Sequence, residues 1–206
     1  MWFWFTFALS GLVGNDAALE RKVTRAIAFK AFAYTCLVYA LLQASVGESF
    51  IGLVAIVGVL TSLVADILLF VQQRFRLSFV LITGALLLYG WALWLRVGTP
   101  SLSWLPALLF ALAIVLFLLF LPHLGRSWIP AAAITLTSIQ LAWAAIEWWM
   151  MSSQIATVLG VIGVFLIPIV AILLGLQHTK NVLWREPRVS AAIYLLANGL
   201  IIASLL

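Results

Sequence analysis

The sequence predicts an all-α membrane protein with eight transmembrane helices, short loops and both termini on the non-cytoplasmic side. Its composition is the first reason: 66% of its 206 residues are hydrophobic and 8% are charged. A soluble domain carries about 25% charged residues, because its surface must interact with water. The same composition excludes a disordered chain and a disulfide-rich scaffold. The bilayer is therefore the solvent for most of this chain.

The second reason is the division of the sequence into apolar runs, most of them close to the ~20 residues that cross a bilayer as a helix. An open sheet would leave its edges unsatisfied in lipid, and a barrel would alternate in polarity with a period of two. The segment LFALAIVLFLLFL (109–121) shows no such alternation. Residues 1–206 are thus expected to form a single polytopic domain, with helices at about 2–14, 26–45, 50–71, 77–95, 102–121, 128–150, 155–176 and 189–206.

The first four runs are separated by charged segments. The run 2–14 is short for a membrane span, and no basic segment precedes it, so we expect no cleavable signal peptide. The second run begins within a basic cluster that follows residue 20. The segment QQRFR (72–76) separates the third run from the fourth.

The last four runs carry more individual features. The fifth is almost uniformly apolar, and the sixth opens on Trp128-Ile129-Pro130. Pro168 lies inside the seventh and should kink that helix, either as a structural bend or as part of a functional site. The eighth carries Tyr194 and Asn198, which lie one helical turn apart on one face.

The positive charges predict the orientation. Ten of the 11 Lys and Arg residues fall in or beside alternate loops, and Arg96 alone falls on the opposite side. Cytoplasmic loops of membrane proteins carry this excess, so both termini are predicted outside the cytoplasm. The net charge of +5 is read as facing anionic lipid, with no nucleic acid as a partner. We expect an integral, multi-pass protein of a bacterial inner membrane.

Three ionisable residues lie within the runs: Lys30, Asp66 and Glu147. An acid at mid-helix costs about 2.5–3.5 kcal/mol on insertion scales, so Asp66 requires a reason to be there. Glu147 lies near the outer end of its run and is expected to reach water. Lys30 lies about one turn inside its run, where its side chain could extend to the membrane surface.

Four of these polar residues are predicted to share one layer near the cytoplasmic side. Counting from the helix ends places Lys30 and Asp66 at the same depth, together with Tyr194 and Asn198. Two interpretations remain open for this layer. It is either a polar pocket that opens toward the cytoplasm or an interhelical ion pair with hydrogen bonds.

Other chemistry has little support in the sequence. His123 and His178 are both expected in loops, without a cysteine or carboxylate at metal-ligand spacing, so no metal is predicted. Nucleotide-binding and serine-hydrolase motifs are absent from the sequence, and no cofactor is expected. Ser62, one turn before Asp66, is expected to bond a backbone carbonyl rather than to act as a nucleophile.

At these residues the chain resembles the YhhN-like lysoplasmalogenase family of eight-helix membrane proteins. The resemblance extends nearly end to end, and the order of the motifs carries it, since each motif alone is weak. The matching positions are Lys30-Ala31, Ala65-Asp66-Ile67-Leu68-Leu69, Tyr89, Trp128-Ile129-Pro130, and Tyr194 with Ala197-Asn198.

The resemblance implies hydrolysis of the vinyl ether bond of lysoplasmalogens to a fatty aldehyde and a glycerophospho-ethanolamine or -choline. Asp66 would then be the catalytic acid and base, and Lys30, Tyr89, Tyr194 and Asn198 would shape the substrate pocket. The expected partners are a lysophospholipid in the inner leaflet and the surrounding membrane lipids.

The sequence departs from the family pattern at two places. Leu86 stands at the helix 4 histidine, and FLIPIVAIL (165–173) replaces the Ser-Asp of helix 7, with Ile169 at the depth of the missing acid. An Asp66 that Lys30 holds ionised can activate water but cannot protonate an alkene. Three hypotheses therefore stay open: a hydrolase, a non-catalytic relative that binds or senses lysolipids, and a small transporter. The oligomeric state is also open.

Overall fold

The computed structural model describes residues 2–44, 50–72, 74–124, 128–177 and 187–206. In these residues the chain is all-α, as the composition predicts. It forms eight α-helices and one π-helical segment, η2, that continues α3. Their bounds are α1 Trp2–Leu19, α2 Val23–Gln43, α3 Phe50–Asp66, η2 Ile67–Val71, α4 Phe75–Val97, α5 Leu105–Leu124, α6 Trp128–Ser152, α7 Ile155–Gln177 and α8 Pro187–Ala203.

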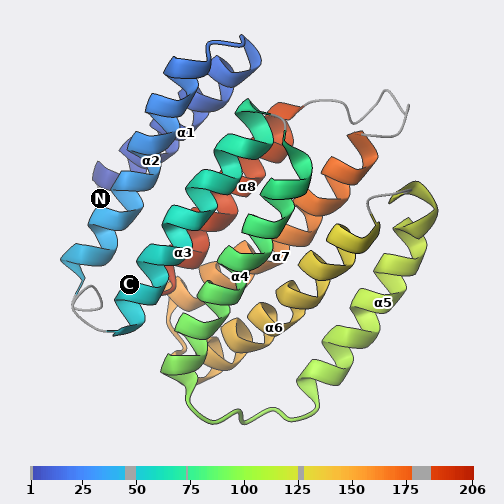
Figure 1. Cartoon of the computed structure of the whole chain (residues 1–206). Helices are drawn as coiled ribbons and strands as arrows, with labels where there is room; N and C mark the ends of the chain where they lie inside the picture. Colours follow the sequence, from blue (N-terminus) through green and yellow to red (C-terminus); the bar gives the residue numbers. More distant parts are fainter. Residues whose placement is uncertain (1, 45–49, 73, 125–127, 178–186) are drawn as a thin grey trace.

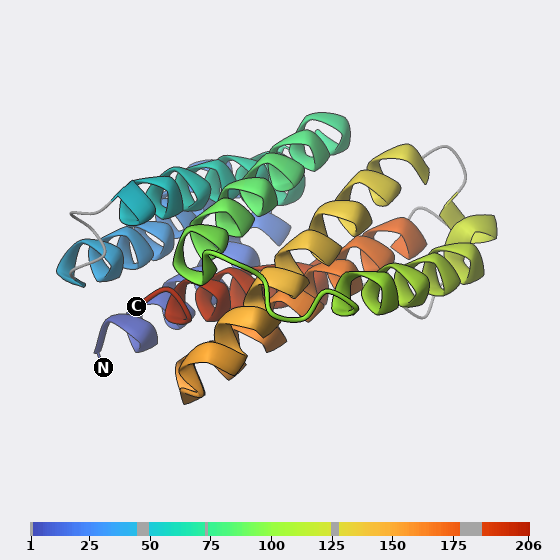
Figure 2. The same cartoon turned by 90° about the horizontal axis from the view of Figure 1, so that it is seen from below.

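The helices form one bundle in which α8 lies near the centre (Figure 1). The α1–α2 hairpin lies along one edge and α5 along the opposite edge, a separation that the view from below also shows (Figure 2). Consecutive helices pack as the pairs α1–α2, α3–α4 and α7–α8, while α8 also contacts α1, α2 and α3. Residues from α1, α2, α3, α4 and α8 can therefore meet in one place.

The lengths and compositions of the described helices support a multi-pass membrane protein. Two shorter helical stretches, at 105–119 and 189–203, are apolar as well. The five segments long and apolar enough to cross a membrane are Val23–Gln43, Phe50–Val71, Arg76–Val97, Ile129–Ser152 and Ile155–Leu173.

The first helix is longer than the sequence predicts. We expected it to end at residue 14, but α1 continues to Leu19. Asn15 and Ala17 are both buried, so this added turn packs into the bundle. The sequence places the end of the apolar run before polar Asn15, whereas in the structure Asn15 faces a polar side chain of another helix.

Small residues allow the helices to approach closely, as in other membrane bundles. At Gly58 of α3 a Cβ atom would lie 2.7 Å from the Tyr89 ring of α4. Tyr34, Tyr89 and Tyr194 are all fully or almost fully buried. The bundle interior therefore holds three phenol groups, each of which needs a hydrogen-bond partner.

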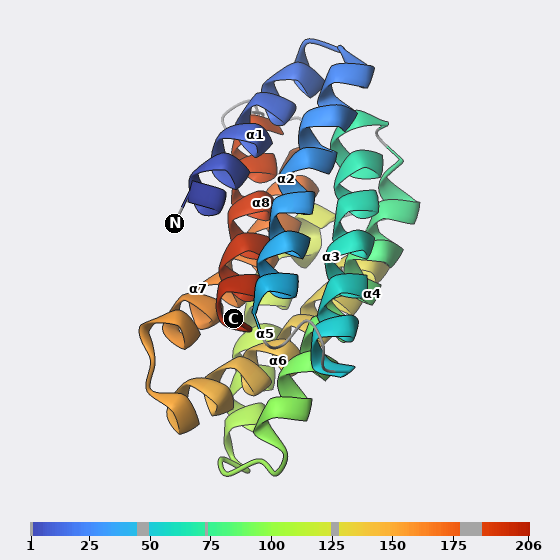
Figure 3. The same cartoon turned by 90° about the vertical axis from the view of Figure 1, so that its left-hand side faces the viewer.

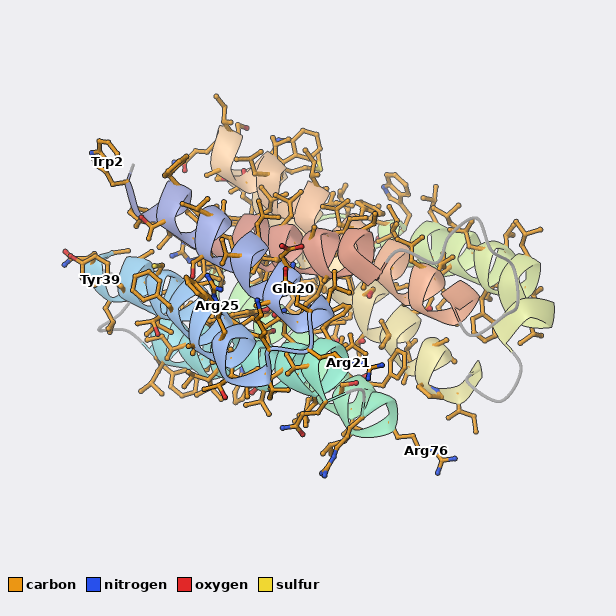
Figure 4. The ribbon with its side chains drawn as sticks, turned by 90° about the horizontal axis from the view of Figure 1, so that it is seen from above. Trp2, Glu20, Arg21, Arg25, Tyr39 and Arg76 are labelled. Atoms are coloured by element: carbon orange, nitrogen blue, oxygen red, sulfur yellow. The ribbon has the colours of Figure 1, made fainter. Side chains whose placement is uncertain are left out.

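The two ends of the bundle differ in their side chains (Figure 4). Trp2 of α1 and Tyr39 of α2 lie at one end, whereas Arg21 and Arg76 lie toward the other. Arg21 has a φ of 58° in the tight turn between α1 and α2. This turn brings α2 back beside α1 in antiparallel orientation.

Candidate functional site

A buried ion pair lies at the centre of the candidate site. The Lys30 Nζ of α2 is 2.8 Å from the Asp66 Oδ1 of α3, and each side chain is 1% exposed. The expectation that Lys30 extends to the membrane surface is therefore wrong. Two charges removed from water need close pairing and further hydrogen bonds, because the cost of dehydrating them is several kcal/mol per ion.

Two more residues surround the Lys30 ammonium. The Asn15 Oδ1 of α1 accepts a hydrogen bond from Lys30 Nζ at 2.6 Å, and the Phe70 ring of η2 lies 5.3 Å from the same nitrogen. Gly14 makes this approach possible, since a Cβ there would lie 3.1 Å from the backbone nitrogen of Lys30. Neither Asn15 nor Phe70 was among the predicted site residues.

Polar atoms around the pair remain unpartnered. Among the described residues, Asp66 Oδ2, the Tyr34 hydroxyl and Asn15 Nδ2 are buried without a hydrogen bond. Tyr34 lies one turn after Lys30 on the same face of α2, and its hydroxyl lies near the Asp66 carboxylate. Buried polar groups normally have hydrogen-bond partners. These three unpartnered atoms can therefore form hydrogen bonds with a water or a substrate atom.

A second set of hydrogen bonds joins the other predicted residues. The Tyr89 hydroxyl of α4 donates to Asn198 Oδ1 of α8 at 3.0 Å, and Ser62 Oγ lies 3.1 Å from the same hydroxyl. Asn198 Nδ2 donates to the Tyr194 carbonyl at 2.9 Å. Ser62 thus binds a side chain, not the backbone carbonyl that we expected for it.

The backbone changes its winding at the acid. Asp66 is the last residue of α3, and the next five residues form the π-helix η2. Phe70 of η2 contacts the Tyr194 ring, with centroids 6.4 Å apart, as well as Lys30. Such π-helical turns are rare and occur often at functional sites. The turn brings α3, η2 and α8 together beside the ion pair.

The comparison with known protein families identifies the family of this chain. The sequence profile of the YhhN family matches residues 25–205, which is most of the chain. The chain belongs to the YhhN family. Comparison with curated proteins and with solved structures gave no match. The YhhN match includes Lys30, Asp66, Tyr89 and Asn198, whereas Asn15 on α1 lies before its first residue.

The second buried carboxylate of this YhhN-family chain, Glu147, has a different role from that of Asp66. Glu147 was expected to reach water but is fully buried. Its carboxylate accepts hydrogen bonds from the Ser101 and Leu102 backbone nitrogens, from Ser101 Oγ and from Trp143 Nε1. Glu147 therefore fixes the segment between α4 and α5 to α6, which explains its burial.

The two departures from the expected pattern of motifs lie in apolar surroundings. Leu86 is 2% exposed in the core. Ile169 is 44% exposed and lines an apolar cavity between α5, α6 and α7, together with Pro168. Ile169 therefore lies beside an apolar cavity whose lining does not include Asp66 or Lys30.

The sequence predicts both histidines in loops. His123 lies within α5 rather than in a loop as we expected, and His178 lies outside the described residues. Within the residues that the structure describes, no group of three His, Cys, Asp or Glu is placed to hold a metal ion.

Proposed function

We propose that this YhhN-family protein hydrolyses the vinyl ether bond of lysoplasmalogens, with Asp66 as the catalytic residue. One observation carries the proposal: Asp66 keeps a buried oxygen free of hydrogen bonds while its other oxygen is bound to Lys30. A carboxylate whose function is structural would be expected to use both oxygens. The family membership supports the same reaction class.

The proposed reaction needs one carboxyl group acting twice. In the proposed reactive form, one proton of the Lys30–Asp66 pair has moved across the 2.8 Å hydrogen bond to Asp66, so that both groups are neutral. Asp66 in its protonated form donates this proton to the alkene carbon that is not bonded to the ether oxygen, giving an oxocarbenium ion and an Asp66 carboxylate. Water adds to the oxocarbenium carbon and returns a proton to Asp66. The resulting hemiacetal collapses to a fatty aldehyde and a glycerophospho-alcohol.

The neighbouring side chains support each step. The Lys30 Nζ holds Asp66 Oδ1 in position through their hydrogen bond, which leaves Oδ2 to meet the substrate or the water. The Tyr34 hydroxyl is unpartnered and can orient that water. Tyr89 and Asn198 form the adjoining wall through their mutual hydrogen bond. Such fixed dipoles lower the barrier because they need no reorganisation during the reaction.

The direct test is aldehyde release from lysoplasmenyl-ethanolamine by the purified protein beside Asp66→Asn. We expect release by the wild type and none by the variant. Glu20→Gln is the matched control, because Glu20 is exposed and pairs with Lys22 at the surface. If Asp66→Asn retains turnover, Asp66 is not the catalytic residue.

A folding control separates chemistry from stability. Asp66→Asn leaves Lys30 charged in the core, which destabilises the fold by itself, so a loss of turnover must be distinguished from unfolding. The double variant Lys30→Met/Asp66→Leu removes both charges and keeps similar volumes. A folded double variant without turnover supports the proposal, whereas a folded and active one contradicts it.

Lysolipid binding without catalysis is the second candidate function. It is favoured by the cavity of about 310 Å³ between α5, α6 and α7, whose lining is almost entirely apolar. A cavity of this size can hold part of a hydrocarbon chain. Stabilisation of the protein by lysolipid in a melting experiment, with no aldehyde released by a folded wild type, would support this candidate over the hydrolase.

The proposal includes a topology for the chain. All eight helices would cross a bacterial inner membrane, with both termini outside the cytoplasm and the lysolipid in the inner leaflet. The charge count supports this orientation. Cysteines introduced one at a time near residues 2 and 21, in a Cys36→Ala background, should react with an impermeant reagent from the outer and the inner side, respectively. The opposite pattern would reverse the topology.

A further inference from the structure

We propose that a groove between α1 and α8 admits the polar end of a single-chain glycerophospholipid to the Asp66 site. This inference rests on the proposed function, since it names the route and the class of its substrate. The groove encloses about 520 Å³, a volume typical of ligand sites. Its lining residues are Leu12, Val13, Asn15, Asp16, Val189 and Ala192.

A route is needed because the reacting group is enclosed. Asp66 is 1% exposed, and its free oxygen is buried. The groove comes within one side chain of the ion pair, because Asn15 lines it and also accepts the hydrogen bond from Lys30 Nζ. A ligand in the groove that displaces Asn15 would therefore contact the Lys30–Asp66 pair directly.

The packing of α1 on α8 explains where the groove opens. Figure 3 shows the two helices side by side, and their closest contacts lie farther along the bundle. A Cβ at Gly11 would clash with a methyl carbon of Leu195, and a Cβ at Gly199 would lie 2.7 Å from the Phe7 ring. The groove begins beyond Gly11 and extends toward the turn that carries Arg21.

The polar groups of the groove match a zwitterionic head group. Asn15 Nδ2 is a buried donor without a partner, suited to a phosphate or glycerol oxygen. Asp16 is an exposed carboxylate in the same lining, suited to the ammonium of ethanolamine or choline. Arg21 and Arg25 lie at this end of the bundle and attract the phosphate (Figure 4).

The apolar groups of the groove match a single chain. Leu12 and Val189 are 52% and 48% exposed, so they offer hydrocarbon surface on both sides of the opening. The ligand class is thus a lysophospholipid, with its chain in the bilayer and its head group near Asn15.

Photo-crosslinking tests this site without turnover. The probe is an alkyl-ether lysophosphoethanolamine, which has no vinyl ether to hydrolyse, with a diazirine close to the glycerol. We expect labelling on 12–16 and 189–192, with loss of signal when unlabelled lysophosphoethanolamine competes. Labelling confined to the cavity between α5, α6 and α7 would overturn the proposal.

Variants sharpen the test. Ala192→Trp fills the groove and should raise the probe concentration for half-maximal labelling by at least about tenfold, equivalent to 1.4 kcal/mol. Ala28→Trp is the matched control, since Ala28 is an exposed alanine on α2 outside the groove. Val189→Trp replaces the first variant if that one fails to fold. Unchanged labelling in a folded groove variant contradicts the proposal.

Aldehyde release measured on the same preparations separates the two proposals. Turnover that depends on Asp66 without labelling of the groove would reject the route and leave the hydrolase. Labelling of the groove without turnover would support the lipid site and reject the hydrolase.

Discussion

Two carboxylates are buried among the residues that the structure describes, and they differ in how their oxygens are used. Glu147 lies near one end of α6, where its two oxygens receive hydrogen bonds from two backbone nitrogens, a serine hydroxyl and an indole. Asp66 lies at the junction of α3 with η2, where one oxygen binds Lys30 and the other has no partner. Both are at most 1% exposed.

The difference separates a structural acid from a candidate catalytic one. The partners of Glu147 come from a loop that the carboxylate fastens to a helix, and its hydrogen bonding is complete. The partners of Asp66 come from another helix and leave it incomplete, a state that costs free energy unless a ligand completes it. Burial and charge are alike in the two groups, so neither property alone marks a site.

The largest expected effect follows from breaking the Asp66 pair on one side. Lys30→Met leaves an uncompensated buried acid and should lower the free energy of unfolding by about 3–5 kcal/mol. Denaturation in mixed micelles measures this loss. The double variant Lys30→Met/Asp66→Leu should recover most of it. A double variant as unstable as the single one would show that the side-chain volumes, not the charges, matter there.

The second prediction concerns Glu147. Glu147→Gln keeps the shape but weakens hydrogen bonds to a charged acceptor, so we expect a loss of about 1.5–3 kcal/mol in stability. Aldehyde release below the melting temperature should stay close to that of the wild type. Both quantities are measured on one preparation. If a folded Glu147→Gln variant lost turnover, this result would contradict the distinction between Glu147 as a structural acid and Asp66 as a catalytic one.

A third prediction moves the wall of the Asp66 site without touching a charge. Gly58→Ala places a Cβ 2.7 Å from the Tyr89 ring, and such overpacking typically costs about 1–3 kcal/mol. We expect a lower melting temperature and slower aldehyde release. Gly84→Ala is the matched control on α4, since a Cβ there meets nothing within 4 Å. Equal effects of the two changes would contradict the role of Tyr89 in the wall.

The smallest effect is expected from removing one hydroxyl. Tyr89→Phe deletes the hydrogen bonds to Asn198 and Ser62, and each is worth about 0.5–1.5 kcal/mol. Turnover should fall more than stability does, because the ring stays in place. The control is Thr61→Val, which removes an exposed hydroxyl that bonds only its own helix backbone in the described residues. A Tyr89→Phe variant that loses stability but no activity would make this network purely structural.

Much of the site was predictable because membrane-embedded polar residues are rare. Lys30 and Asp66 stood out from apolar sequence, and counting depth from the helix ends predicted that they share a layer. Their 2.8 Å separation agrees with that prediction. Tyr34 was missed although it lies one turn from Lys30 on the same face, a signal that the sequence does contain.

Other residues had no signal of this kind. Asn15 lay beyond the predicted end of the first helix, and only the approach of α1 at Gly14 brings it to Lys30. The partners of Glu147 come from a loop more than 40 residues away in sequence, so its burial was not predictable. Ile169 lines an apolar cavity between α5, α6 and α7, and the sequence did not predict this because depth along a helix does not determine which face a residue occupies.

The sequence by itself determined the class of this protein, since its composition requires a bilayer and its apolar runs require helices. It also determined which residues are so unfavourable in lipid that they need an ionic or hydrogen-bonding partner. The tertiary structure decided which partners they receive, because helix rotation and close approach at glycines depend on packing across the whole bundle. That packing satisfies Glu147 completely and leaves Asp66 with a free oxygen.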